Sequence, residues 1–266
     1  MTERRITWLL IAAMASSCLL KGSLAGHTDY CQLCDDDVTH IACGNDGSFS
    51  DECPSNAKLL TIEEDEQQAI VAAHNEVRQQ WAQGNGHVKV KACRMATVEW
   101  DAELAKLAEL NVKQCVMEHD DCHSTDRFIN SGQNLFITGF SGMGAPDMST
   151  LLRSAVEEWA LEGKDVKAGY LAKYPDNYNG PTIGHFTMVV HERSIAVGCA
   201  ASNFDEDGFN TFLVACNYAT TNFIGWPVYS ACHKAGEHCK AGKNPNYPAL
   251  CSTSESVDYN FNDQGI

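Results

Sequence analysis

A short apolar run over residues 184–190 begins with a glycine and has a histidine at its second position. Phe186 and Met188 occupy one set of alternating positions, and Val189 occupies the other, so an extended segment here would be apolar on both faces. Strands of that kind are usually covered by helices on both sides. The pattern predicts a buried strand, with His185 either as a satisfied structural group or as one arm of a polar site.

Three longer segments show the period of amphipathic helices. The first spans residues 62–83 and places His74 on its buried face, where a hydrogen-bonded core histidine is commoner than a ligand. The second follows Trp100, with Asp101 as its cap. The third spans residues 147–162. Its apolar arc contains Met148, Leu151, Leu152, Ala155, Val156, Trp159 and also Glu162.

Glu162 is the most informative carboxylate, because an unpaired buried charge is too costly to persist. The pattern predicts that Glu162 finds a polar partner or a wet cavity. In the alternative, the helix has frayed by this residue and the side chain is exposed. A loop over residues 163–183 is expected next, carrying Tyr170, Tyr174 and Tyr178.

Alternating or apolar runs predict strands over residues 133–138, 195–201 and 211–218. The last two are separated by turn residues and predict a hairpin. Cys199 and Cys216 are symmetric about that turn. They would face each other across adjacent strands, within reach of a disulfide.

The two ends of the chain indicate an exported, oxidised protein. Residues 1–25 have the basic start, apolar run and small residues of a signal peptide. Of 13 cysteines, Cys18 lies in that leader, and the remaining twelve are an even number, as disulfide pairing requires. Zinc at Cys31 and Cys34 is the alternative, but this C-x-x-C has no matching second pair.

The predicted organisation is therefore a signal peptide, a cysteine-rich arm over residues 26–61, one main domain over 62–225, and a cysteine-containing extension over 226–266 with a disordered end. The formal net charge of −16 excludes nucleic acid as a natural partner, because phosphate backbones would be repelled. No second apolar run is long enough to cross a bilayer.

Four blocks resemble, in position and order, the signatures of the CAP superfamily, which comprises cysteine-rich secretory, antigen 5 and pathogenesis-related 1 proteins. The resemblance covers roughly residues 64–223, and the arm from Tyr30 to Cys34 looks like the antigen 5 (venom allergen) branch. The blocks are His74-Asn75-Glu76-Val77-Arg78, Gly132-Gln133-Asn134-Leu135, Gly184-His185-Phe186-Thr187 and Phe212-Leu213-Val214-Ala215-Cys216-Asn217-Tyr218.

The resemblance implies an α+β fold, a three-layer α-β-α sandwich with an added arm and extension. It also implies four disulfides. For the four other cysteines three pairings remain open, with Cys239–Cys251 favoured. The implied bridges are Cys31–Cys43, Cys34–Cys122, Cys53–Cys115 and Cys199–Cys216.

Many family members line a cleft with two histidines and two glutamates. Here the resemblance assigns His185 and His123 to the histidines and Glu162 to one acid. Gln133 replaces the other acid, which removes a charge and a metal ligand. Met188 and His191 also depart from the family pattern. His123, Glu162 and His185 together predict at most a weak divalent cation site, zinc being the natural candidate, and no required cofactor.

Enzymatic activity is not expected. Ser124 would have to act with His185 and Glu162, but it adjoins His123, and no Gly-x-Ser-x-Gly elbow exists. We expect a secreted, monomeric protein that binds extracellular proteins as an effector of saliva, venom or body fluid. The alternative is a carrier of fatty acids or sterols, held near the third helix.

Overall fold

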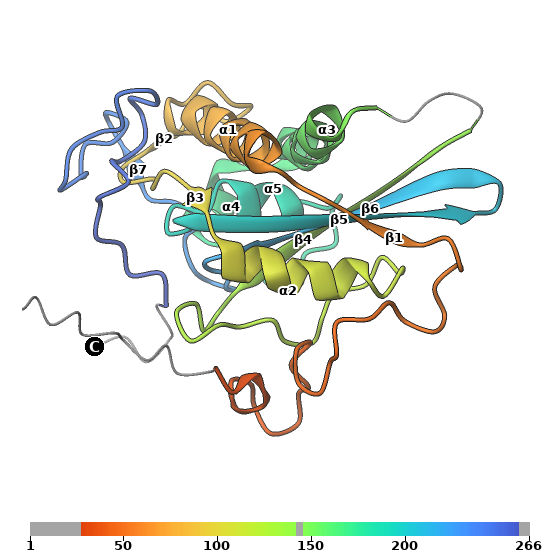
Figure 1. Ribbon diagram of the computed structural model, residues 1–266. Coiled ribbons are helices and arrows are strands. Elements are labelled where there is room, and N and C mark those ends of the chain that lie inside the picture. The colour runs from red at the N-terminus through yellow and green to blue at the C-terminus, as the bar shows by residue number, and fades with distance from the viewer. Residues whose placement is uncertain (1–27, 142–145, 261–266) are drawn as a thin grey trace, which may run out of the picture.

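The computed structural model describes residues 28–141 and 146–260; the predicted signal peptide and the last six residues lie outside that range. Helices lie on both faces of one sheet, giving the expected three-layer sandwich (Figure 1). The helical segments are η1 (Tyr30–Gln32), α1 (Glu64–Ala82), α2 (Ala102–Val112), α3 (Met148–Leu161), η2 (Glu162–Asp165), α4 (Ala168–Ala172) and α5 (Gly184–Val189).

The main sheet has the order β1-β5-β6-β4, with β3 added in parallel to β5. A separate ladder joins β2 to β7. β4 lies at one end of the main sheet and pairs with β6 only. The strands are β1 (Lys58–Leu60), β2 (Lys91–Ala92), β3 (Glu99–Trp100), β4 (Gly132–Phe140), β5 (Ala196–Glu206), β6 (Phe209–Tyr218) and β7 (Ala231–Cys232).

The sheet separates two apolar layers. α1, α3 and α5 pack on one face and share a core that includes Trp81, Trp159 and Phe186. α2 packs on the other face with a smaller core around Leu135 and Leu213. Within the described residues, no helix is long and apolar enough to cross a membrane.

The expected buried strand over residues 184–190 is wrong, because this segment forms the short helix α5. Four consecutive residues, Phe186 to Val189, are buried, so the helix has no solvent-facing side that would reveal its period. The expected loop over 163–183 is also partly helical, since it contains η2 and α4. The long helices begin within two residues of their predicted starts, and Asp101 and Asp147 cap α2 and α3.

All twelve cysteines of the described residues are bridged. Cys199 and Cys216 lie directly opposite each other in the β5–β6 hairpin, as the turn symmetry predicted. Cys115 lies beyond the end of α2 and is bonded to Cys53. The six bridges are the four implied by the resemblance, the favoured Cys239–Cys251, and Cys93–Cys232, which ties the C-terminal extension to the main domain.

The block from His74 to Arg78 serves the fold. His74 is fully buried and bonds the carbonyl of Ile70 and the hydroxyl of Tyr218, which makes it the structural histidine expected from the sequence. Asn75 exchanges two hydrogen bonds with the backbone of Val98. Arg78, also fully buried, donates to the carbonyls of Ala96, Val189, His191 and Ser194.

Candidate functional site

A cleft of about 410 Å³ lies where the end of α3, the outer edge of β4 and the start of α5 meet. Its floor contains Trp159, Glu162 and His185, and its rim carries exposed apolar side chains. Those of Met117, Ile137 and Leu161 are 46%, 37% and 59% exposed. The remaining lining residues are Leu135, Phe136, Glu158, Lys164, Asp165, Pro181 and Thr182.

Glu162 has found the partner that its inward position required. It ends α3, and its Oε1 accepts a hydrogen bond from Nδ1 of His185 at 2.6 Å. Its Oε2 accepts from the backbone N–H of Phe186 at 3.0 Å, one of the unpaired donors in the first turn of α5. One carboxylate therefore both caps α5 and fixes the His185 ring.

Neighbouring groups hold this pair in place from both sides. The Trp159 ring stacks on the His185 imidazole, with ring centroids 6.4 Å apart. Nε1 of Trp159 donates a hydrogen bond to the carbonyl of Leu135. Asn134 donates to the carbonyl of His185 and to the hydroxyl of Tyr218. The Glu162–His185 pair is thus a rigid polar floor built on α3, α5 and β4.

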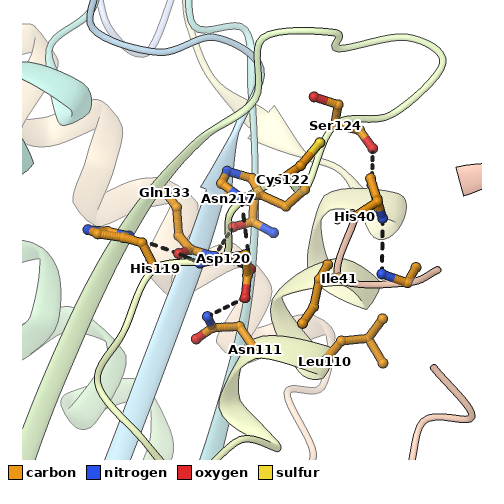
Figure 2. A network of polar contacts seen from close by, with 12 residues as sticks. His40, Ile41, Leu110, Asn111, His119, Asp120, Cys122, Ser124, Gln133 and Asn217 are labelled. Carbon is orange, nitrogen blue, oxygen red and sulfur yellow. Dashed lines mark hydrogen bonds and ion pairs between the residues drawn. The ribbon is translucent and has the colours of Figure 1, made fainter. Parts of the chain in front are cut away.

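Gln133 belongs to a second polar network, on the other face of β4 (Figure 2). Its Oε1 accepts from Nδ1 of His119 at 2.9 Å, and its Nε2 donates to Asp120 at 2.7 Å and to Asn217 at 3.0 Å. Asn111 donates to the other oxygen of Asp120. Burial raises the pKa of Asp120, although the bonds from Asn111 and Gln133 oppose that change.

The sequence did not identify His119, which the structure places in this network. His119 and His123 lie on either side of Cys122, which is bonded to Cys34. Their spacing alone does not show which imidazole reaches Gln133. The one available signal was the adjacent Asp120, which joins the same network.

The structure brings together Glu162 and His185 but shows no contact between either residue and His123. The His123 ring is nearly buried, lies 3.8 Å from Asp120, and has no hydrogen-bond partner for either nitrogen. Burial, helped by the nearby His119 and His40, lowers the pKa of His123 to about 4, although interactions with the backbone of Gly132 and Ser131 oppose the change.

The residues present fit a metal ion poorly. Among residues 28–141 and 146–260, two groups of three ligand atoms lie close enough to share an ion: Cys34, His40 and Cys122, and Cys93, Cys232 and His238. Each contains two cysteines joined in a disulfide, which leaves no thiolate to bind metal. His123, Glu162 and His185 are not among these groups of close ligand atoms. A zinc site on these three residues stays a prediction.

The serine considered for nucleophilic catalysis points elsewhere. The hydroxyl of Ser124 donates to the carbonyl of Ile129 in its own loop at 2.8 Å. Ser124 is absent from the residues that line the cleft. A nucleophile must lie within hydrogen-bond reach of its base, and no such contact joins Ser124 to His185.

Known proteins agree with this architecture. A profile of the Cysteine-rich secretory protein family (CAP) matches residues 71–218. Venom allergen-1 of Aedes albopictus is 37% identical over 236 residues, covering 86% of this chain and 90% of that protein. Tabinhibitin 6 of Tabanus yao is 30% identical over 253 residues, covering 95% and 96% of the two chains.

Among solved structures, NaASP2 crystallised with Zn²⁺ has a TM-score of 0.57 and 26% identity, covering 75% of this chain and all of that one. BmVAL-1 has a TM-score of 0.59 at 20% identity, covering 75% and 98% of the two chains, and shows the fold alone. Six disulfides and a secretory family together indicate a secreted protein. The chain belongs to the CAP superfamily of cysteine-rich secretory proteins, in its antigen 5 branch.

Proposed function

We propose that this protein is a non-enzymatic effector that binds an extracellular protein through the cleft beside β4. The observation that carries the proposal is the cleft rim, where Met117, Ile137 and Leu161 expose large apolar side chains around a rigid polar floor. Exposed apolar surface with a polar surround is typical of protein-binding sites. The related Tabinhibitins carry the name of inhibitors, which fits action by binding.

The floor supports binding more than turnover. Nδ1 of His185 is already engaged by Glu162, and the hydroxyl of Ser124 is engaged by its own loop. No nucleophile, base and orienting group converge among the described residues of the cleft. The Glu162–His185 pair is suited to exchange hydrogen bonds with a bound partner.

A matched pair of surface variants tests the proposal. Leu161 on the rim and Ile224 outside the cleft are 59% and 61% exposed, so Leu161→Asp and Ile224→Asp disturb the fold to a similar, small extent. Each protein is immobilised and exposed to blood plasma, the fluid that a venom protein meets, and captured proteins are quantified by mass spectrometry. Wild type and Ile224→Asp should capture the same proteins, and Leu161→Asp should lose them. Equal capture by both variants would contradict the proposal.

Binding of a small hydrophobic ligand is the second candidate. The same cleft lies beside the end of α3, and its volume of about 410 Å³ lies within the range of small-molecule sites. Delipidated protein mixed with a labelled fatty acid or sterol at micromolar concentration provides the test. Uptake that Leu161→Asp abolishes would favour the carrier, and no uptake would remove it.

A further inference from the structure

We propose that the outer edge of β4 over residues 135–140, where the backbone groups of Ile137 and Gly139 are unpaired, receives an extended, basic segment of a partner protein as an added strand. The proposal rests on the cleft being a protein-binding site and names how the partner binds there. It follows from the hydrogen-bonding direction of β4, from the chemistry of its edge, and from the charge of the adjoining cleft.

The β5–β6 hairpin fixes which backbone groups of β4 are free. Its turn is the two-residue Asp207–Gly208, both with positive φ, so Glu206 and Phe209 form a hydrogen-bonded pair. Because backbone hydrogen bonds alternate along β6, the N–H and C=O groups of Phe212 and Val214 point toward β4. There these two residues pair with Thr138 and Phe136. The N–H and C=O groups of the intervening residues in β4 therefore point away from the sheet.

The Trp159 contact confirms that direction, because its Nε1 reaches the outward carbonyl of Leu135. The next outward residues are Ile137 and Gly139. Within residues 28–141 and 146–260, no partner lies on the N–H or C=O of either residue. Ile137 and Gly139, the two successive outward-facing residues, thus offer two backbone N–H donors and two C=O acceptors to an incoming strand.

Edges of sheets are usually protected, because unpaired strands recruit other chains. The usual protections are charged side chains, prolines, bulges, short length or a covering element. The segment Leu135-Phe136-Ile137-Thr138-Gly139-Phe140 has no charge and no proline, and its pairing with β6 runs without a bulge. An uncharged, regular edge of this length indicates a surface that is covered when the protein functions.

The cleft adjoins the first half of this edge, and its charge selects the occupant. Leu135, Phe136 and Ile137 form one side, and the end of α3 forms the other. The acids of that second side are Glu158, Glu162 and Asp165, against one lysine, Lys164. A second copy of this chain would place like charges against each other, which disfavours self-pairing. A basic segment is complementary to both the cleft and the net charge of −16.

The two sides of the groove also set the pattern of that segment. Side chains of an added strand alternate between faces. One set would meet the acids beside α3, and the other would meet the apolar rim at Met117 and Ile137. The expected partner sequence therefore alternates basic and apolar residues over about six positions, the length of the outer edge.

The test uses the acetylated, amidated peptide Lys-Val-Lys-Val-Lys-Val and two N-methylated isomers. In one isomer the methyl groups lie on the lysine nitrogens, and in the other on the valine nitrogens. Only one set of peptide amides, those of the lysines or those of the valines, can point toward β4. The isomer methylated on that set should bind roughly tenfold more weakly than the other, the loss expected for one or two hydrogen bonds. Amide hydrogen exchange in the full chain should slow at Ile137 and Gly139 when the unmodified peptide binds.

Several outcomes would overturn strand addition. These are equal binding of the two isomers, equal binding of Glu-Val-Glu-Val-Glu-Val, unchanged exchange at Ile137 and Gly139, no binding at millimolar peptide, or sedimentation showing that a second copy covers the edge. If plasma proteins are still captured and Leu161→Asp still loses them, the cleft remains a binding site and only the strand mechanism fails. If Leu161→Asp captures normally, the cleft itself is not the binding site.

Discussion

At the scale of single residues, the cleft is defined by how completely its polar groups are already used. Glu162 bonds both His185 and the N–H of Phe186, and Gln133 is held by His119, Asp120 and Asn217. A metal ion would have to compete with these hydrogen bonds. At Gln133 it would find a neutral amide oxygen in place of the carboxylate that a strong site needs.

We therefore expect no zinc binding tighter than micromolar in the isolated protein. Isothermal titration calorimetry with ZnCl₂ is the measurement, with His185→Ala and His123→Ala as the two variants. Nanomolar affinity that disappears in both variants would restore the site on His123, Glu162 and His185. Loss only in His185→Ala would instead place a site without His123.

Arg78 gives a second prediction at this scale. Its guanidinium serves four carbonyls in the core, and burial lowers its pKa to about 9. Lysine has one nitrogen and cannot reach all four acceptors. Arg78→Lys should lower the free energy of unfolding by more than about 3 kcal/mol in urea denaturation. The control Arg153→Lys, at an exposed pair with Glu76, should cost less than about 1 kcal/mol.

At the scale of elements, the sequence predicted the long helices because each has a solvent-facing side, and it predicted the hairpin because turn residues separate two apolar runs, both buried over most of their length. α3 shows a clear apolar arc, and β5 and β6 are divided by turn residues. α5 failed because all its central residues are buried, so period 2 and period 3.6 are equally apolar. The carboxylate of Glu162, from another part of the chain, accepts a hydrogen bond from the first turn of α5, a contact that no local pattern reveals.

The same limit applies to the candidate site. Glu162 was identified because its charge contradicts its position on the apolar arc of α3. His119 and His123 carry no such contradiction, and the path of the loop around Cys122 decides between them. Local pattern therefore predicted the half of the site that lies on a regular helix, and tertiary contacts determine the other half.

The contact between α2 and β5 supplies a prediction at the element scale. Gly198 lets the helix approach the strand closely, since a Cβ there would lie 2.7 Å from the carbonyl carbon of Leu104. Gly198→Ala should destabilise the protein by about 1–3 kcal/mol, because backbone and not a flexible side chain must move. Gly169→Ala is the control, with no atom within 4 Å of its added Cβ. Equal stability of the two variants would mean that α2 can shift freely.

At the scale of the whole molecule, disulfides connect what the layers do not. Cys34–Cys122 fastens the arm to the loop before β4, Cys53–Cys115 fastens it just beyond the end of α2, and Cys93–Cys232 fastens the C-terminal extension. They span 88, 62 and 139 residues of sequence. Bridges of that span restrict the unfolded chain strongly and keep the peripheral segments in place.

Buried histidines make the stability of the whole molecule depend on pH. Burial lowers the pKa of His74 and His123 to about 4 and that of His191 to about 3, from about 6.5 when unfolded. The unfolded chain therefore binds more protons as pH falls below 6.5, so acid favours unfolding. The melting temperature should fall steadily from pH 7 to pH 5, by about 2–4 °C for each kcal/mol lost. The raised pKa of Asp120 acts in the opposite sense near pH 4, which is why the test stops at pH 5.

A variant assigns the effect to the histidines. His123→Leu removes one buried ring whose nitrogens lack a well-formed hydrogen bond, with Asp120 3.8 Å away, so the fold loses little bonding and the titration loses one group. Differential scanning calorimetry should show a smaller drop in melting temperature between pH 7 and pH 5 for this variant than for wild type. His233→Leu, at an exposed position in the C-terminal extension, should keep the wild-type drop. The same slope in all three proteins would mean that His123 stays neutral in the unfolded chain or becomes protonated without cost in the folded one, and its burial would then carry no pH dependence.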